Sequence, residues 1–504
     1  MKKAIAIYCC VIFLTSTAMF AQESTPAQQS QSQPVAKQTQ DAPPPKHTLG
    51  PLEVSVNWRT RAEGWYWFEA PTGNSDYGFW DSLLRVGIGQ TGEHFDWFIE
   101  GEQPSILGLP NDAVIAAPQG QLGLGGNYYA ANNNNHTNVA NGFVKQAFVN
   151  LKSLGPVGLK IGRFEYFDGL EVKPKDAMLA GIVQSRISSR LISNFAFTAV
   201  QRSFDGVQLS VNSGRNNLTF LGSRPTQGVF QVKGMNELDV DSYYGAYTRQ
   251  VGRERNVGDF RVFAIGYIDH RTTVLKTDNR PATVRAADFG KIEVATWGAD
   301  YVHVAHVPGA GDFDFLAWGA LQTGSWGALT QRAAAFVGEA GWQAPLRVKP
   351  WLSLGYSYGS GDGNASDTRH GTFFQDLPTP RQYARFPFYN MMNNEDLYAT
   401  FNIRPVSKLT LRSEVHTLRL ASSSDLWYSG GGAFQPNTFG FTGRPSNKNQ
   451  GLANVWDFST DYQFTRSFAA TLYYGHAWGK GVVSSIYPKD ANGQLIFLET
   501  NFHF

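Results

Sequence analysis

Residues 52–63 read Leu-Glu-Val-Ser-Val-Asn-Trp-Arg-Thr-Arg-Ala-Glu, and apolar and polar side chains alternate along most of this stretch. The apolar Val54 and Trp58 fall on one face, whereas Arg59 and Arg61 fall on the other. A period of two is that of a β-strand, because successive side chains point to opposite faces of a sheet. The stretch therefore predicts a strand with one apolar and one charged face.

The same alternation returns along the chain, for example in residues 395–404 and 408–419. It also runs through residues 496–504, where the sequence ends on Phe504. A closing strand that ends on an aromatic residue is typical of outer-membrane barrel proteins. Aromatic pairs near strand ends, such as Trp65 and Trp67, would suit the interfacial girdles of such barrels.

We predict about 18 strands from this pattern. They span residues 52–64, 81–90, 95–102, 143–152, 157–164, 195–202, 207–221, 241–249, 258–269, 293–305, 313–323, 332–342, 348–358, 395–404, 408–419, 454–464, 468–478 and 493–504.

The connections between these strands are expected to alternate between short and long. The short turns lie at 91–94, 153–156, 203–206, 405–407 and 465–467, and the long loops at 103–142, 165–194, 270–292, 359–394 and 420–453. Bacterial outer-membrane barrels have this asymmetry. The predicted fold class is therefore all-β, a transmembrane antiparallel β-barrel; a soluble sandwich of similar strands is the alternative.

The N-terminal region predicts export from the cytoplasm. Residues 1–21 carry two lysines, an apolar run and small residues suited to cleavage after Ala18 or Ala21, as in a secretory signal peptide. Residues 22–48 are rich in Gln, Ser and Pro and predict a disordered leader, so the barrel is expected over 49–504. We expect the mature protein in the bacterial outer membrane.

Composition excludes several other classes of protein. The charged fraction is only 17%, with 43 Lys and Arg against 41 Asp and Glu, so no basic excess indicates a nucleic-acid partner. After the first 20 residues, no apolar run approaches the length of a membrane-spanning helix. The two cysteines lie in the predicted signal peptide, which leaves no thiol for a disulfide, a metal site or a nucleophile.

Two short matches to catalytic patterns are better explained as parts of strands. Residues 87–92 fit a dinucleotide fingerprint, but an alternating strand follows them where that motif requires a helix. Residues 355–359 fit a nucleophile elbow, but they lie within a strand that leads into a loop. A barrel enzyme such as a lipase would need a Ser and His constellation, and we find none. We predict that the protein is not an enzyme and has no catalytic residue.

A possible structural calcium site lies in residues 362–367, where Asp362, Asn364 and Asp367 offer oxygen ligands at calcium-loop spacing. The downstream bidentate Glu of such loops is missing, and an ordinary Asp/Asn/Gly turn is the alternative. No other cofactor or metal is predicted.

If the apolar faces point to lipid, the opposite faces line a water-filled lumen. Barrels of this size leave an aqueous channel, and rings of Arg and Lys in a pore attract anions. The lumenal candidates that this orientation gives are Arg59, Arg61, Arg85, Lys160, Arg404, Arg412 and Glu414. Paired lumenal charges that serve only solubility are the alternative for each of them.

The chain also resembles the alginate export family of outer-membrane proteins, from about Val54 to Phe504. The resemblance is carried by residues 57–63, 145–151, 159–164 and, above all, 347–362. It implies an 18-stranded barrel with a narrow arginine-rich conduit for a polyuronate, gated by an inward-folded external loop and a periplasmic loop.

The resemblance further implies that Arg59, Arg61 and Arg163 contact an anion in the lumen. Arg163 shares the parity of Leu159 and Ile161, so a β-bulge near Gly162 would be needed to turn it inward.

The sequence thus predicts a passive outer-membrane channel for an anionic polysaccharide such as alginate, or for an oligosaccharide. Its partners would be outer-membrane lipid and that cargo. A selective uptake porin for small solutes is the main alternative, and an adhesin or purely structural barrel is a further one. Periplasmic export partners and the direction of transport are not specified by the sequence.

Overall fold

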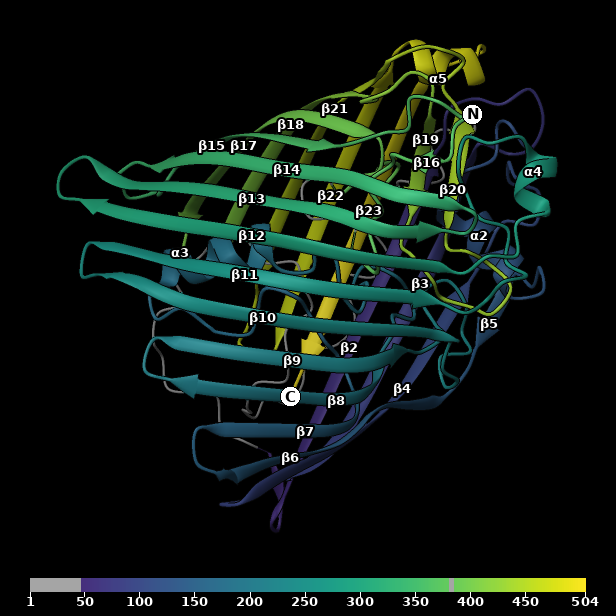
Figure 1. The fold of residues 1–504 in the computed structure, drawn as a ribbon. Helices are drawn as coiled ribbons and strands as arrows, with labels where there is room; N and C mark the ends of the chain where they lie inside the picture. Colours follow the sequence, from purple (N-terminus) through teal and green to yellow (C-terminus); the bar gives the residue numbers. More distant parts are fainter. Residues whose placement is uncertain (1–46, 380–384) are drawn as a thin grey trace.

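The computed structural model describes residues 47–379 and 385–504. The chain forms a closed antiparallel β-barrel of 18 strands (Figure 1). The barrel strands are β2 (Leu52–Tyr66), β3 (Asp76–Thr91), β4 (Phe95–Leu107), β6 (Phe143–Leu154), β7 (Val157–Phe164), β8 (Phe204–Ser213), β9 (Asn216–Pro225), β10 (Val240–Arg253), β11 (Asn256–Asp269), β12 (Ile292–Val307), β13 (Gly311–Trp326), β14 (Leu329–Gln343), β15 (Trp351–Gly359), β17 (Asn394–Val406), β18 (Leu409–Arg419), β21 (Gly451–Gln463), β22 (Phe468–Gly479) and β23 (Asn492–His503).

Several short elements are not members of this ring of strands. They are β1 (Thr48–Leu49), α2 (Gly125–Asn132), β5 (Asn138–Ala140), α3 (Ala177–Ile182), the π-helical turn η3 (Val183–Ile187), α4 (Ala282–Ala286), β16 (Arg369–His370), the hairpin of β19 (Leu426–Gly430) and β20 (Phe441–Pro445), and α5 (Gly481–Ile486). Within the described residues, no helix is long and apolar enough to cross a membrane. The predicted signal peptide and residues 22–46 of the predicted leader lie outside the described residues.

Closure of the barrel depends on the last strand. β23 pairs antiparallel with β2, and Trp58 lies opposite Phe502 while Arg61 lies opposite Glu499. Because directly opposed residues share a face, the pairing extends the apolar and charged faces of β2 onto β23. The predicted closing strand at the C-terminal end is confirmed.

The connections differ between the two ends of the barrel. One end has short connections such as Gly214 and Arg215 between β8 and β9, and the other has the long loops (Figure 1). One connection at the long-loop end is also tight, since Gly327 and Ala328 alone join β13 to β14. In outer-membrane barrels the long loops face the cell exterior.

Two of the predicted strands are wrong. Residues 195–202 form no strand but belong to a loop that runs from 165 to 203, so the predicted turn at 203–206 is also wrong. Residues 207–221, predicted as one strand, contain the hairpin of β8 and β9. Residues 195–202 are mostly apolar and do not alternate strictly, whereas residues 207–212 alternate and are followed by the polar residues 213–217, which contain the turn. The sequence pattern therefore did not distinguish a strand from a buried loop, or one strand from a hairpin. The two errors cancel in the strand count.

The faces follow the predicted alternation. Outward side chains are apolar and exposed, as at Trp58, Leu321 and Leu354. Inward side chains are mostly buried, and they include many charged groups. Trp65 and Trp67, predicted in an interfacial girdle, are only 2% exposed, because both pack against the aromatic residues of the inward-folded loops. That prediction is wrong.

Candidate functional site

The lumen is occupied by a long segment between β7 and β8, residues 165–203, which we call the inner loop. It contains α3 and η3, and its apolar residues Leu191, Ile192 and Val200 are fully buried. The predicted loop at 165–194 is thus confirmed as a loop, but it is longer and lies inside the barrel. Residues 195–202 are mostly apolar, and nothing in this local sequence shows that the segment packs inside the barrel and not in its wall.

Two arginines of β2 hold the inner loop. The Nη1 atom of Arg59 donates to the carbonyl oxygen of Ala196 at 2.6 Å, and its Nη2 atom donates to that of Thr198 at 2.7 Å. Arg61 donates from Nη1 to the carbonyl oxygen of Phe197 at 2.7 Å. Three consecutive backbone carbonyls are therefore bound by two neighbouring inward-facing guanidinium groups.

The same arginines are paired with carboxylates of the wall. Arg61 lies 2.5 Å from Glu499 of β23 and 3.2 Å from Glu63, and Arg59 lies 3.4 Å from Asp81 of β3. These two arginines and three carboxylates, which we call the first cluster, are each at most 5% exposed. Burial of this kind is tolerated because each cation has an anionic partner and further acceptors.

A second cluster surrounds Arg85 of β3. Arg85 lies 2.7 Å from Glu102, 3.2 Å from Glu165 and 3.8 Å from Glu100. Lys145 of β6 lies 3.8 Å from Glu102 and 3.6 Å from Glu165. We call these five residues the second cluster. It joins β3, β4 and β6 to the first residue of the inner loop.

The alternation did not predict Lys145 as an inward-facing residue, because a β-bulge turns its side chain inward. Glu100 pairs with Gln146 and Gly101 with Val144, so Lys145 has no partner on β4. Both Lys145 and Gln146 are buried, although strict alternation would turn one of them to lipid.

Two further predicted residues, Arg412 and Glu414, lie on the inward face of β18 and pair with each other. Glu414 also accepts from Thr400 at 2.6 Å and lies 3.2 Å from Arg186 of η3. Arg186 in turn lies 3.5 Å from Glu339 of β14. Arg186 of the inner loop therefore joins two wall strands, β14 and β18, that are separated by β15 and β17.

Arg261 of β11 forms a further contact between the wall and the inner loop. It lies 2.7 Å from Asp300 of β12 and 3.7 Å from both Asp168 and Glu171 of the loop. Arg261 could have been predicted from the alternation of β11, because it lies two residues from the buried Phe263 and so on the same face. Arg186 lies in a loop, where no period marks it.

Another buried arginine joins two of the inward-folded loops. Arg202 donates to the carbonyl oxygens of Gly431 and Ala433, at 2.5 and 3.1 Å. It makes no ion pair with any residue in 47–379 or 385–504, and burial lowers its pKa to about 9. Its guanidinium therefore depends on the backbone of the 420–450 loop.

Lys160 and Arg404 lie on inward faces nearer the short turns. The ammonium of Lys160 lies 4.8 Å from the ring centroid of Phe148 and 5.3 Å from that of Phe164. Within the part of the chain that the structure describes, neither cation has an ion pair. These two predicted residues thus differ from the paired cations of the first and second clusters.

Arg163 does not line the lumen, so its predicted inward position is wrong. It lies opposite Asp205 of β8, on the face that also carries the exposed Ile161 and Val207. Its Nη2 atom lies 2.5 Å from an Asp205 oxygen. The bulge expected near Gly162 is instead at Lys145, so the alternation of β7 is undisturbed and Arg163 points outward.

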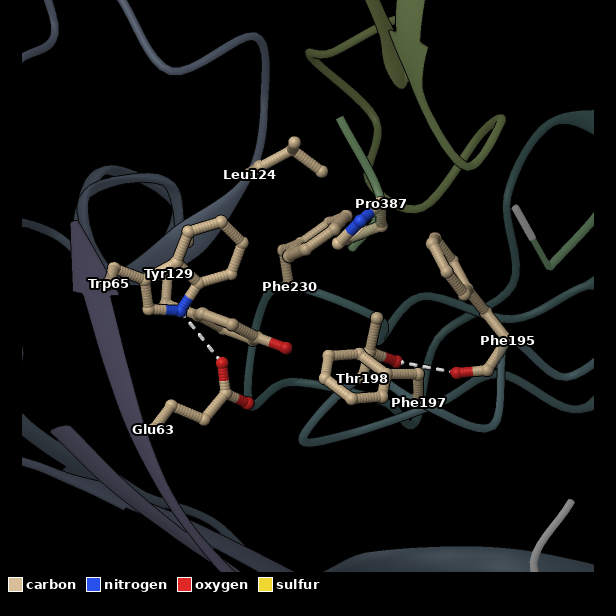
Figure 2. A pocket seen from close by; sticks show the side chains of 10 residues that line it. Glu63, Trp65, Leu124, Tyr129, Phe195, Phe197, Thr198, Phe230 and Pro387 are labelled. Carbon is tan, nitrogen blue, oxygen red and sulfur yellow. Dashed lines mark hydrogen bonds between the residues drawn. The ribbon is translucent and has the colours of Figure 1, made fainter. Parts of the chain in front are cut away.

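A small cavity of about 20 Å³ lies beside the first cluster. Figure 2 shows the aromatic rings of Trp65, Tyr129, Phe195 and Phe230, which come from the barrel wall and three different loops, around this space. Glu63, the charged residue in its lining, accepts from the indole N–H of Trp65 at 2.8 Å. The lining is thus mostly apolar, and the inner loop contributes Phe195, Phe197 and Thr198 to it.

The predicted calcium ligands form successive turns. Asp362, Asn364 and Asp367 each accept a hydrogen bond from the backbone N–H two residues further on. This is the geometry of Asx turns, in which a side chain caps its own turn. The calcium site stays a prediction.

A different group could hold a metal ion. Glu414, His416 and Asp457 offer ligand atoms within 4.8 Å of one another. Asp396 lies 2.9 Å from Nδ1 of His416, a contact that orients the ring. Glu414 is already paired with Arg186 and Arg412, however, so a metal would compete with two guanidinium groups.

The fold is shared with solved outer-membrane channels. OccAB2 of Acinetobacter baumannii is 8% identical, with a TM-score of 0.57 over 90% of this chain and 98% of that one. OccK9 (OpdG) of Pseudomonas aeruginosa is 11% identical, with a TM-score of 0.54 over 90% and 98%. OpdK of the same organism is 10% identical, with a TM-score of 0.51 over 90% and 99%. At these identities the likeness concerns the fold.

A comparison with curated proteins gives no match. Residues 54–480 match the family described as "Alginate export". This match covers most of the chain, and the barrel, its closure by β23 and its inward-facing charges agree with it. The chain therefore belongs to the alginate export family of outer-membrane β-barrel proteins.

Proposed function

We propose that the protein is a gated passive channel of the outer membrane, in which the inner loop closes the lumen. The observation that carries this proposal is the binding of three consecutive carbonyl oxygens, from Ala196 to Thr198, by Arg59 and Arg61. Hydrogen bonds from a charged donor are stronger than neutral ones, yet they exchange readily with water or another acceptor. The family and the structural neighbours support a channel rather than an enzyme.

The first candidate cargo is a polysaccharide or oligosaccharide. The family supports it, and so does the chemistry of the two arginines. When the inner loop leaves, the N–H groups of Arg59 and Arg61 that now bind carbonyls become free for the hydroxyl, ring or carboxylate oxygens of a sugar. The conduit would be Arg59, Arg61, Arg85, Lys160, Arg404, Arg412 and Glu414 on the inward faces.

The second candidate is an uptake porin for small solutes. The fold likeness to Opd and Occ channels fits this function as well. The tight packing of the lumen favours it, because a small solute requires less movement of the inner loop than a polymer does.

Single-channel recording in planar bilayers tests the gate. Arg59→Lys/Arg61→Lys keeps both charges beside Glu63, Asp81 and Glu499, but removes the planar fork that binds the carbonyls. We expect longer and more frequent open events than in the unchanged protein. Arg163→Lys, on the outer face, is the matched control and should leave the gating unchanged.

Equal gating in the double variant and the control, with both barrels folded, would contradict the proposed gate. Blocking experiments then distinguish the two candidate cargoes. Interruption of the current by oligosaccharides that grows with chain length supports saccharide transport. A current that no polymer affects, together with uptake of small solutes by liposomes, supports the porin.

A further inference from the structure

The first and second clusters both contain more carboxylates than cations. Arg59 and Arg61 face three carboxylates, those of Glu63, Asp81 and Glu499. In the second cluster, two cations likewise face three carboxylates. Each cluster therefore has one anionic group in excess when all its members are ionised.

In each cluster, one fully buried carboxylate oxygen has no hydrogen-bond partner among the described residues. These are Oδ2 of Asp81 and Oε1 of Glu102. Asp81 is 1% exposed and Glu102 is 2% exposed, so both oxygens are shielded from bulk water. A buried acceptor without a donor is costly, so each oxygen is suited to accept a hydrogen bond from an N–H or O–H group of a solute.

Opening of the inner loop does not remove this excess. Among the described residues, the loop offers the first cluster only uncharged groups, namely the carbonyls of residues 196–198 and the ring of Phe197. In the second cluster, Glu165 is the residue directly after β7, so it remains tied to the wall when the rest of the loop moves. Water that enters the open lumen favours the ionised form of the carboxyl groups, because it restores their hydration.

We infer that this part of the open lumen selects cations over anions. The solutes that it fits are those with an ammonium or guanidinium group, which would donate to Asp81 and Glu102, as well as neutral saccharides. This inference rests on the proposed channel function. It predicts cation selectivity, whereas the arginines alone would predict anion selectivity. Arg59, Arg61 and Arg85 lie on inward faces, but carboxylates from neighbouring strands outnumber the cations around them.

The effect on the cargo follows from the electrostatics of a narrow pore. A ring of charges with low-dielectric walls produces potentials of several kT, so a single excess charge matters there. A polyuronate would add negative charge beside three carboxylates in each cluster. Neutral sugar oxygens could instead replace the loop carbonyls on Arg59 and Arg61 without adding charge.

Reversal potentials in a potassium chloride gradient test the inference. For the unchanged protein and for Arg59→Lys/Arg61→Lys, we expect potassium to be roughly three to ten times more permeant than chloride. Asp81→Asn and Glu102→Gln, measured separately, should each shift the reversal potential toward that of chloride. Asp205→Asn, which removes a carboxylate from the outer face, should leave it unchanged.

Tetralysine and tetraglutamate serve as charged probes in the same recordings. Block by tetralysine at lower concentration than by tetraglutamate is expected, and this preference should weaken in both lumenal variants. If one variant fails to fold, the other still tests a separate cluster. The unchanged protein by itself shows whether the pore prefers potassium or chloride.

A channel that conducts but prefers chloride would overturn the inference and leave the gate intact. Cation selectivity that neither substitution alters would also overturn it, because the selectivity would then arise elsewhere. If neither the unchanged protein nor the arginine double variant conducts at all, the proposed channel function itself fails.

Discussion

The guanidinium carbon of Arg61 lies 3.7 Å from the ring centroid of Phe197, and the same arginine donates to the carbonyl oxygen of Phe197 at 2.7 Å. One side chain of the barrel wall thus binds both the ring and the backbone of a single inner-loop residue. A cation over an aromatic face adds to the hydrogen bond when water is excluded. Phe197 is therefore a principal point of attachment of the inner loop.

Phe197→Ala should loosen the inner loop without changing any charge. The lost ring contact with Arg61 is worth about 1 to 2 kcal/mol in a desolvated site, so we expect roughly a tenfold rise in the fraction of time spent open. Bilayer recording measures this fraction. Phe289→Ala, at a phenylalanine that is 64% exposed, is the control. Equal open fractions in the two variants would show that the ring does not hold the loop.

Lys145→Met should destabilise the barrel strongly, because it leaves Glu102 and Glu165 with one cation fewer in a buried site. Breaking a buried ion pair from one side costs about 3 to 5 kcal/mol. Lys152 of the same strand pairs with Asp96 at 2.6 Å but is 35% exposed. Lys152→Met should therefore cost less than about 1 kcal/mol. Urea unfolding, followed by tryptophan fluorescence, compares the two, and similar losses would contradict the assignment.

Gly432→Ala should separate two inward-folded loops. Gly432 has a φ of +77°, and an added Cβ would lie 2.3 Å from the carbonyl oxygen of Asp376. An alanine in the left-handed region costs about 1 to 2 kcal/mol before this clash is counted. We expect faster protease cleavage of the 420–450 loop. Gly363→Ala, where no atom lies within 4 Å of the added carbon, should leave the cleavage rate unchanged.

Lowering the pH from about 7 to about 5 should favour the closed lumen. Burial raises the pKa of Asp168 to about 6 and that of Asp425 to about 6, and it raises the pKa of Asp376 well above its usual value. A carboxyl whose pKa is raised by loop packing binds more protons in the packed state, so the packing is strengthened as pH falls through about 6. Above that pH, burial of the ionised groups opposes closure.

The fraction of time that the channel spends open, measured at the two pH values, checks the direction of this effect. It should fall at pH 5, and Asp168→Asn/Asp425→Asn should reduce the difference, because the amide does not titrate. More opening at pH 5 than at pH 7 would contradict the assignment and indicate that loss of ion pairs dominates.

Much of the fold could be predicted from local pattern. Alternation in residues 52–63 correctly placed Trp58 outward and Arg59 and Arg61 inward, and it identified β23 as the closing strand. These properties follow from the geometry of a single strand, since each side chain's face depends only on its place in the sequence. The barrel and the inward position of most predicted charges were therefore determined by the sequence itself.

The tertiary structure decided what those charges bind. The position of residues 195–202 inside the barrel depends on contacts with Arg59, Arg61 and the 420–450 loop, which are far away in sequence. The bulge that brings Lys145 inward, and the undisturbed β7 that keeps Arg163 outward, depend on pairing with neighbouring strands. Long-range packing and strand register produce no periodic pattern in the local sequence. Only the folded barrel therefore shows that carboxylates outnumber cations in the first and second clusters.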